Sequence, residues 1–273
     1  MSSLQVRGLN RNTIDKFYTN SQTVELCIKE FNKVLFDNTN TEDLIIEPSA
    51  GNGAFIDKIK KITSNYKFYD IDPENEEITK LDFLNIENSL LASSHIIGNP
   101  PFGRQSSLAL KFIKKCCNSK VKSISFILPL SFRKDSMKKH FNLNYHLISE
   151  IDIPVNSFLS NGEIINVPCV FQIWKYFENK REQIEKIIPS KFKFVKKTEN
   201  PDISFRRVGI NAGKVSSDID DKNENCHYFI KFNDDESFDF LVDKISNLNF
   251  EHNNTVGPRS ISKQELLYLF EKL

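Results

Sequence analysis

Strand-length runs alternate with helical segments over the first two thirds of the chain, and this alternation constrains the fold more than any other feature. Residues 43–47 form a run without polar alternation, which is typical of a strand buried on both faces of a sheet. Similar strand patterns, separated by helical ones, follow at 66–71, 95–98 and 123–130. The alternation predicts an α/β fold with a mostly parallel sheet and helices on both faces. Residues 147–153 and 166–176 have no clear helix between them, which allows an antiparallel hairpin at the edge.

The charge pattern changes near Glu178. Residues 179–214 contain ten Lys or Arg and four Asp or Glu, whereas residues 216–240 contain two and eight. Long charged runs usually form the solvated surface of a domain. We therefore expect a main domain over residues 1–178 and a small α+β extension over residues 179–273, which is a candidate for substrate binding.

The composition is typical of a globular protein without a membrane-spanning segment. The chain has 273 residues with 39% hydrophobic and 27% charged residues. Its longest apolar runs, such as residues 124–130, are far too short to cross a bilayer, and residues 1–5 show no secretory signal. Five cysteines without zinc-ligand spacing favour reduced thiols, no metal site and a cytoplasmic location. A net charge of +1 means that any contact with nucleic acid must rely on a local patch.

The first candidate site is the loop Glu47-Pro48-Ser49-Ala50-Gly51-Asn52-Gly53, between a predicted strand and a predicted helix. Ligands of open α/β sheets bind at the carboxyl ends of the strands. Gly51 and Gly53 permit a close approach of the backbone. The loop lacks the Gly-Lys-Ser/Thr of a phosphate loop and the three glycines of a dinucleotide site, which argues against a dehydrogenase. Asp70 follows at the offset expected of a carboxylate that binds ribose hydroxyls.

The second candidate site is Asn99-Pro100-Pro101-Phe102, at the end of the fourth predicted strand. Two prolines fix the backbone and remove two N–H donors. The turn therefore presents a side-chain amide, two free carbonyls and an aromatic ring. The amide oxygen and a carbonyl can accept both hydrogens of an exocyclic amine, and Phe102 can stack on the ring that carries the amine.

Together these motifs resemble the N6-adenine methyltransferases that use S-adenosylmethionine, especially the DNA-modifying group. The matching motifs, which occur in that family's order, are Lys16–Thr19, Glu47–Phe55, Tyr69–Pro73, Asp82–Phe83, Asn99–Phe102, Phe126–Lys134 and Asn156–Phe158. The resemblance covers about residues 14–176. It implies a Rossmann-like class I methyltransferase fold and S-adenosylmethionine as the cofactor.

The resemblance also assigns roles to individual residues. The cofactor-binding residues that it implies are Phe17, Tyr18, Thr19, Glu47, Pro48, Ser49, Gly51, Gly53, Asp70, Ile71, Asp82, Phe83 and Asn99. The catalytic residues that it implies are Asn99, Pro100, Pro101 and Phe102. Hydrogen bonds from adenine N6 to Asn99 and Pro100 would free the nitrogen lone pair for in-line attack on the methyl group, and Phe102 and Phe158 would hold the flipped base.

The residues after 178 suggest how a nucleic acid is held. The loop from Arg206 to Lys214 is basic and contains glycine, which suits phosphate contact. We expect Arg206, Arg207 and Lys214 to contact backbone phosphates. The alternative is that these arginines form ion pairs with the acidic block and merely hold the extension together.

Other functions remain open at this point. RNA is the close alternative to DNA, because the same tetrapeptide serves both substrates. Methylation of protein glutamine is a third enzyme function, although that group more often has Tyr where Phe102 stands. A catalytically silent binding partner would keep the fold, but the intact Asn99 tetrapeptide and Asp70 argue against it. The protein partner, if there is one, is not indicated by the sequence.

Overall fold

The computed structural model describes residues 17–160, 162–182, 186–233, 237–250 and 258–272. The chain forms two compact units that divide between residues 183 and 184, and each is described by itself below. The charge pattern of the sequence predicts this division after Glu178. In the described part of the chain, no helix has the length and apolar character needed to cross a membrane.

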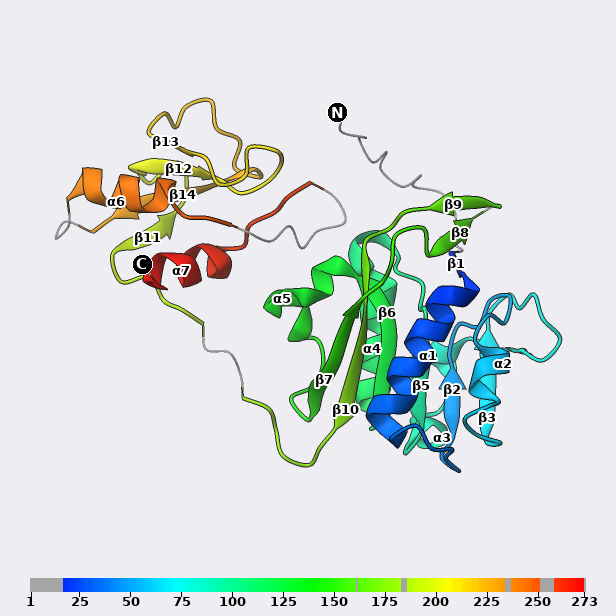
Figure 1. The fold of residues 1–273 in the computed structure, drawn as a ribbon. Helices are drawn as coiled ribbons and strands as arrows, with labels where there is room; N and C mark the ends of the chain where they lie inside the picture. The colour runs from blue at the N-terminus through cyan, green and yellow to red at the C-terminus, as the bar shows by residue number, and fades with distance from the viewer. Residues whose placement is uncertain (1–16, 161, 183–185, 234–236, 251–257, 273) are drawn as a thin grey trace. The chain divides into compact units, whose positions relative to one another are not determined.

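The larger unit is built on a seven-stranded sheet (Figure 1). Across the sheet, the strands are β4 (Thr79–Lys80), β3 (Tyr66–Asp70), β2 (Ile45–Glu47), β5 (His95–Gly98), β6 (Ser123–Pro129), β10 (Cys169–Tyr176) and β7 (Tyr145–Asp152). The pairs from β4 to β6 are parallel, and β10 is antiparallel to both β6 and β7. The predicted mostly parallel sheet is confirmed, and its antiparallel pair is β7 and β10, with β7 at the edge.

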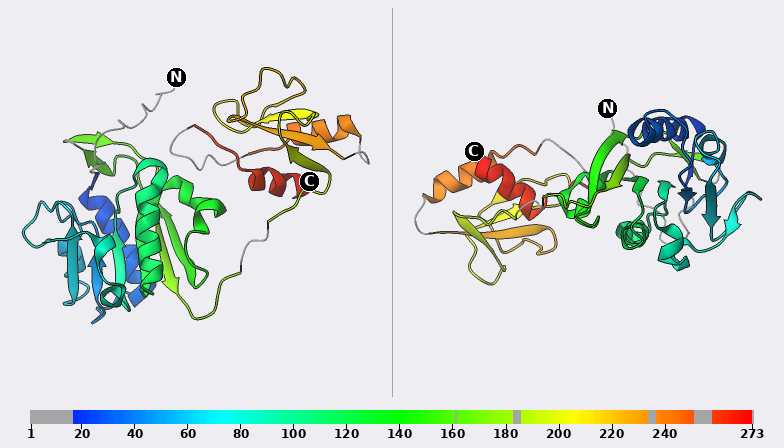
Figure 2. Two further views of the ribbon diagram at one scale, coloured as in Figure 1. Left: turned by 180° about the vertical axis from the view of Figure 1, so that it is seen from behind. Right: turned by 90° about the horizontal axis from the view of Figure 1, so that it is seen from below.

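Helices cover both faces of this sheet. α1 (Ser21–Phe36) lies on one face and α4 (Ser107–Asn118) on the other, as Figures 1 and 2 show. The Asn20 side chain accepts a hydrogen bond from Thr23 N and so caps α1. The remaining helical segments of the unit are short: α2 (Ile56–Ile59), η1 (Phe83–Asn85), α3 (Asn88–Leu91), η2 (Arg104–Ser106), η3 (Leu130–Arg133) and α5 (Asp135–Lys138).

A small antiparallel sheet joins the start of the described chain to a distant segment. It contains β1 (Tyr18–Thr19), β8 (Phe158–Ser160) and β9 (Glu163–Ile165), in that order. Thr19 pairs with Phe158, so the residues before α1 are held beside the segment that follows β7. Asn20 N also donates to Ser157 O at 2.9 Å. These bonds fix Phe17, Tyr18 and Thr19 near the carboxyl ends of the parallel strands.

The core between the sheet and α4 is aromatic and aliphatic. Its largest side chain, Trp174, is 2% exposed and stacks on Phe141 with ring centroids 4.0 Å apart. The indole Nε1 donates to Gln172 Oε1 at 3.0 Å, which satisfies the buried N–H. This packing fixes the sheet on which the candidate site is built.

The C-terminal unit is an antiparallel sheet with two helices. Its strands are β11 (Phe192–Val195), β14 (His227–Phe232), β12 (Ile203–Arg206) and β13 (Val215–Ser216), in that order. α6 (Phe238–Ser246) and α7 (Lys263–Lys272) share an apolar core with the sheet. The two helices lie on the same side of it (Figure 2). The predicted α+β extension is confirmed as a structure.

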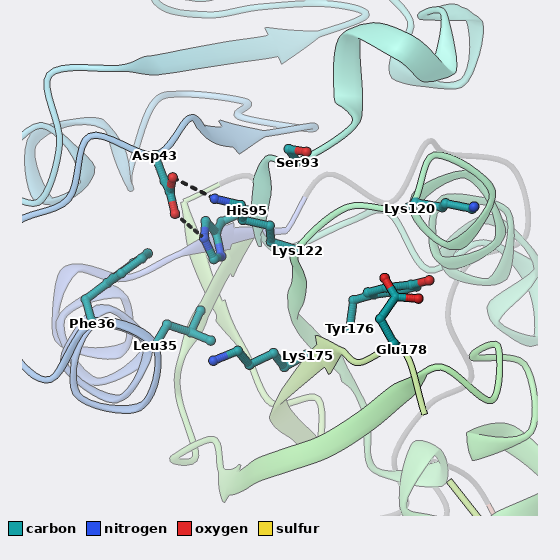
Figure 3. Close-up of a pocket in the computed structure, with 10 residues that line it drawn as sticks. All are labelled: Leu35, Phe36, Asp43, Ser93, His95, Lys120, Lys122, Lys175, Tyr176 and Glu178. Carbon is teal, nitrogen blue, oxygen red and sulfur yellow. Dashed lines mark hydrogen bonds and ion pairs between the residues drawn. The ribbon is translucent and has the colours of Figure 1, made fainter. Parts of the chain in front are cut away.

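His95 forms a buried polar cluster at the amino-terminal edge of the large sheet. Its Nδ1 lies 2.8 Å from Ser123 Oγ, and its Nε2 lies 3.2 Å from Asp43 Oδ2. Lys122 completes the cluster with an ion pair to Asp43 at 2.7 Å (Figure 3). Burial lowers the pKa of His95 from 6.5 to about 4, although Asp43 acts in the opposite direction.

We expect this cluster to make the protein less stable in mild acid. The folded state holds His95 neutral, while the unfolded state binds a proton near pH 6.5, so the stabilisation is complete above that pH and is lost as the pH falls toward 4. The loss from His95 between pH 8 and pH 5 is on the order of 2 kcal/mol. Denaturant unfolding at the two pH values measures it. His95→Asn should reduce the difference, and an unchanged difference would contradict the assignment.

A cavity of about 500 Å³ opens beside this cluster. Lys120, Lys122 and Lys175 line it together with Asp43 and Glu178. Figure 3 shows the Lys120 and Lys175 ammonium groups pointing away from one another, and Lys122 turned to Asp43. The cavity lies where the parallel strands begin, so it is at the edge opposite the predicted site.

Candidate functional site

The predicted site residues gather at the carboxyl ends of three neighbouring parallel strands. Glu47 is the last residue of β2, and Asp70 is the last residue of β3. Asn99 follows β5, which lies on the other side of β2. Because parallel strands end at the same edge of a sheet, segments far apart in the sequence meet there (Figure 1).

The glycine loop is held between Tyr18 and Asp70. Gly51 has a φ of 53°, and a Cβ added there would lie 3.4 Å from the Tyr18 ring. Its N–H donates to Asp70 Oδ2 at 2.8 Å. A side chain at this position would be strained by the backbone conformation, and its Cβ would contact the tyrosine ring. The Tyr18 hydroxyl also donates to Glu74, a residue that the sequence analysis did not single out.

The second glycine and its neighbours shape the same loop. Gly53 has a φ of 85°, and a Cβ there would lie 2.8 Å from Ile56 Cδ1. Pro48 is buried at the start of the loop. The Ser49 hydroxyl donates to the Asn99 carbonyl at 3.2 Å, which ties the glycine loop to the tetrapeptide.

Asp70 supports the loop and remains available to a ligand. Its Oδ1 accepts from Asp72 N at 2.9 Å, and its Oδ2 accepts from Gly51 N. A carboxylate oxygen has more than one lone-pair site, so both oxygens can still accept a hydroxyl proton. Ile71, the next residue, is 55% exposed and gives the site an apolar surface.

Asp82 and Phe83 follow β4 beside Asp70. Leu81 N donates to Asp70 O at 2.8 Å, which places Asp82 at the same edge. Asp82 caps the short helix η1 by accepting from Leu84 N at 2.9 Å. The Phe83 ring is 1% exposed and stacks on Phe112 in the core, with centroids 5.3 Å apart.

Glu47 is a buried carboxyl group beneath the loop. It is 2% exposed, and its Oε2 has no hydrogen-bond partner among the described residues. Burial raises the pKa of Glu47 well above its usual value, and the negative charge of Asp70 adds to the rise. A Cβ at Gly98 would lie 3.2 Å from Glu47 Cγ, so glycine there leaves room for the carboxyl. An unpartnered buried oxygen is costly unless a ligand satisfies it.

The amide nitrogen of Asn99 is hydrogen-bonded, whereas its amide oxygen has no partner among the described residues. Its Nδ2 donates to Phe17 O at 3.3 Å and to Thr19 Oγ1 at 3.2 Å. Its Oδ1 is buried and accepts no hydrogen bond in the described part of the chain. Pro100, the next residue, is buried, and Pro101 is half-buried. The first motif therefore orients the amide so that its oxygen is left as an acceptor.

The aromatic residues of the predicted base site are only partly brought together. Phe102 is 8% exposed, and its ring centroid lies 6.5 Å from that of Phe17. Phe158 is 1% exposed and sits on β8, opposite Thr19. The described rings include no direct contact between Phe102 and Phe158. Gln105 and Ser106, just beyond the tetrapeptide, have positive φ angles of 53° and 62°, which is strained backbone beside the site.

The basic residues of the predicted phosphate site lie in the C-terminal unit. Arg206 ends β12, and its Nε donates to Val208 O at 2.9 Å. Arg207 lies over the Tyr228 ring, 5.2 Å from its centroid, and donates to Asn225 O at 3.3 Å. Lys214 is exposed just before β13. Among the described residues, neither arginine forms the ion pair with the acidic block that was the alternative prediction.

The described residues contain no cluster of three or more His, Cys, Asp or Glu side chains arranged to hold a metal ion. Cys27, Cys116, Cys117, Cys169 and Cys226 are free thiols. The site is thus one of carboxylates, an amide, carbonyls and aromatic rings.

Comparison with known proteins finds a family match within the larger unit. Residues 40–166 match the family model of the EDM2 methyltransferase-like domain. This range contains β2, β3, β5 and the glycine loop, and it ends within the segment after β9. No match was found among curated proteins.

Solved structures with a similar fold include several methyltransferases. The 23S rRNA methyltransferase ErmE is 12% identical over 62% of this chain and 72% of its own, with a TM-score of 0.46. A modification subunit of a putative type I restriction enzyme from Vibrio vulnificus YJ016 is 12% identical over 59% of this chain and 44% of its own, with a TM-score of 0.47. A putative RNA methyltransferase from Pyrococcus horikoshii is 12% identical over 60% of this chain and 87% of its own, with a TM-score of 0.43.

The strand order of the large sheet, together with the match of residues 40–166 to a methyltransferase-like domain, is that of a Rossmann-like class I methyltransferase, and this fold implies S-adenosylmethionine as the methyl donor. The residues present fit that cofactor. Gly51 and Gly53 have positive φ angles that let the loop turn tightly after β2, and Asp70 retains acceptor capacity for ribose hydroxyls. The match to a methyltransferase-like domain supports methyltransferase activity.

Proposed function

We propose that the protein transfers a methyl group to the N6 amine of adenine in DNA. The observation that carries this proposal is the Asn99 side chain, whose amide nitrogen is tied to Phe17 O and Thr19 Oγ1 and whose buried oxygen has no partner among the described residues. The buried acceptor is already oriented before substrate arrives. An exocyclic amine is a group that would satisfy it.

The adjacent backbone supplies the second acceptor. Pro100 has no N–H, so its carbonyl is the polar group that it offers to a ligand. With Asn99 Oδ1, it can accept both N6 hydrogens of an adenine. These two bonds would withdraw the nitrogen lone pair from conjugation with the ring and direct it toward the methyl donor. Most of the rate acceleration in such a reaction comes from aligning the amine nitrogen with the methyl group.

S-adenosylmethionine would supply an activated methyl group on a positively charged sulfur. Gly51, Asp70 and Ile71 would hold its nucleoside part, while Tyr18 and Thr19 would close the site from the other side. The Ser49 bond to the Asn99 carbonyl joins the cofactor loop to the catalytic turn. This hydrogen bond would hold the methyl donor and the adenine amine in a fixed position relative to each other.

A nucleic-acid substrate is supported by three features together. The acceptor pair suits an adenine amine, Phe102 offers a ring beside it, and the C-terminal unit carries the basic residues Arg206, Arg207 and Lys214. An adenine in a duplex must leave the stack to reach Asn99. Contact of the basic residues with phosphates would supply affinity without reading the sequence.

Incubation with labelled S-adenosylmethionine tests the proposal. Separate pools of duplex DNA, single-stranded DNA, RNA and protein are offered, and the modified nucleoside or residue is identified after digestion. We expect N6-methyladenine in the DNA pools. Label in RNA would keep the chemistry and change the substrate, whereas label on protein glutamine would overturn the adenine assignment. Cofactor binding without transfer to any pool would favour the silent binding partner.

A further inference from the structure

The sheet of the C-terminal unit has two faces of different character. The inner face packs on α6 and α7 through Phe192, Ile203, Phe205 and Ile230. Because side chains alternate along a strand, the residues between these belong to the opposite, outer face. By the strand register, the outer-face residues are Lys193, Lys231, Val195, Phe229, His227, Ser204, Arg206 and Ser216. Phe229, His227 and Ser204, in the middle of this face, are buried.

Two pairs of like charges lie directly across from each other on this outer face. Lys193 is paired with Lys231 in the register of β11 and β14. Arg206 N donates to Lys214 O at 2.8 Å, so these two residues face each other across the turn between β12 and β13. Like charges directly opposite on one face repel each other, and a bound anion would offset that repulsion.

The protein itself supplies little compensation there. Among the described residues, none of these four side chains has a carboxylate within 4.0 Å. Asp202 neighbours Lys231, but its Oδ2 accepts from Phe232 N at 2.7 Å. The nearby acidic loop pairs internally, since Asp218 lies 3.4 Å from Lys222.

A cavity of about 380 Å³ opens at the Arg206 and Lys214 end of the face. Lys222 and His227 also line it, as does one carboxylate, Asp221. The loop that borders it is anchored by Lys197, whose Nζ donates to Asp220 O at 2.7 Å and to Lys222 O at 3.1 Å. His227 is 8% exposed, and its Nδ1 lies 2.9 Å from Asn223 O. Arg206, which also lines the cavity, has its guanidinium held by the bond from Nε to Val208 O.

We propose that the cavity lined by Arg206 and Lys214 seats one phosphate of a nucleic-acid backbone. The proposal rests on the proposed function for the class of its ligand. A phosphate accepts hydrogen bonds from guanidinium and ammonium groups at once, and it would offset the repulsion between the two cations. Arg207 lies against Tyr228 and does not line the cavity.

Lys193 and Lys231, the other like-charge pair, lie farther along the sheet. Residues 227 and 231 of β14 are four positions apart, which separates the two like-charge pairs by about 13 Å. Phe229 and Ser204, which lie between the two pairs, are buried, so Lys193 and Lys231 would act on the bound strand only as more distant charges. Contacts in the cavity are made with a phosphate, so they set affinity and its salt dependence and leave base choice to the methyltransferase site.

Salt-dependent binding of the full chain to labelled DNA oligonucleotides tests this proposal. Affinity is measured between 50 and 200 mM salt, and the slope of log affinity against log salt is compared between variants. Removing two phosphate contacts with Arg206→Gln and Lys214→Gln should flatten the slope by about 1.4–1.8. The pair Lys193→Gln and Lys231→Gln should have a smaller effect in the same direction.

The matched control removes two cations from the helical side of the same unit. Lys244 lies over the Phe270 ring and Lys263 over the Phe194 ring, each 4.4 Å from the centroid. Lys244→Gln with Lys263→Gln should leave the slope unchanged, and thermal unfolding confirms that every variant is folded. Equal flattening in both double variants would show a general charge effect and overturn the proposal. So would an unchanged slope in the Arg206 and Lys214 variant, or a wild-type chain that does not bind oligonucleotides.

The proposed methyltransferase function and the proposed phosphate site can each be contradicted without the other. Methylation of adenine with an unaltered salt slope would retain the function and remove the phosphate site. Salt-dependent binding that is lost with Arg206 and Lys214, without methyl transfer to any pool, would retain the phosphate site and remove the function.

Discussion

Asn99→Ala is expected to lower the turnover of adenine methylation by 100-fold or more, which is on the order of 3 kcal/mol. The substitution removes the buried oxygen that has no partner among the described residues, and with it one of the two acceptors for the N6 hydrogens. Affinity for S-adenosylmethionine should stay nearly intact. Single-turnover methylation and calorimetry of cofactor binding measure the two quantities.

Asn99 also anchors Phe17 and Thr19, so the variant needs controls. Thr19→Val removes one of those anchoring bonds and leaves the Asn99 oxygen in place, so its loss of turnover should be the smaller one. Asn144→Ala removes an amide that bonds Phe177 O and Glu178 O outside the site, and it should leave turnover unchanged. Wild-type turnover in Asn99→Ala would falsify the catalytic role of the tetrapeptide.

Asp70→Ala is expected to weaken S-adenosylmethionine binding by about 1–3 kcal/mol, since ribose hydroxyls would lose a charged acceptor. Part of the loss could come from the loop, because Asp70 also accepts from Gly51 N and Asp72 N. A cofactor analogue without the ribose 2′-hydroxyl separates the two effects. If the carboxylate binds the ribose directly, the substitution costs less affinity for the analogue than for the full cofactor.

Asp57, exposed on α2, offers a matched aspartate, and Asp57→Ala should bind the cofactor as the wild type does. The same loss for both ligands in Asp70→Ala would mean that the carboxylate only supports the glycine loop. Unchanged binding of both ligands would remove Asp70 from the cofactor site.

Much of the fold could be read from local pattern. The apolar run that ends at Glu47 and the strand pattern that ends at Gly98 formed β2 and β5, because continuous apolar runs fit a doubly covered sheet. Asn20 caps α1 in the way that is typical of an asparagine at the start of a helix. The positions of Gly51 and Asp70 after their strands were enough to predict that they would meet, since parallel strands end at one edge.

The sequence by itself therefore determined the α/β class, the edge of the sheet that holds the site and the identity of its polar groups, because each follows from spacing along one segment. Only the tertiary structure decided how those groups are oriented. The Asn99 amide is turned by Phe17 and Thr19, about 80 residues earlier in the chain, and Phe83 and Phe158 are buried by packing that no local pattern records. Strand register also decided that Arg206 and its neighbour Arg207 lie on different faces of the C-terminal sheet. A shift of one residue along a strand would exchange the two faces.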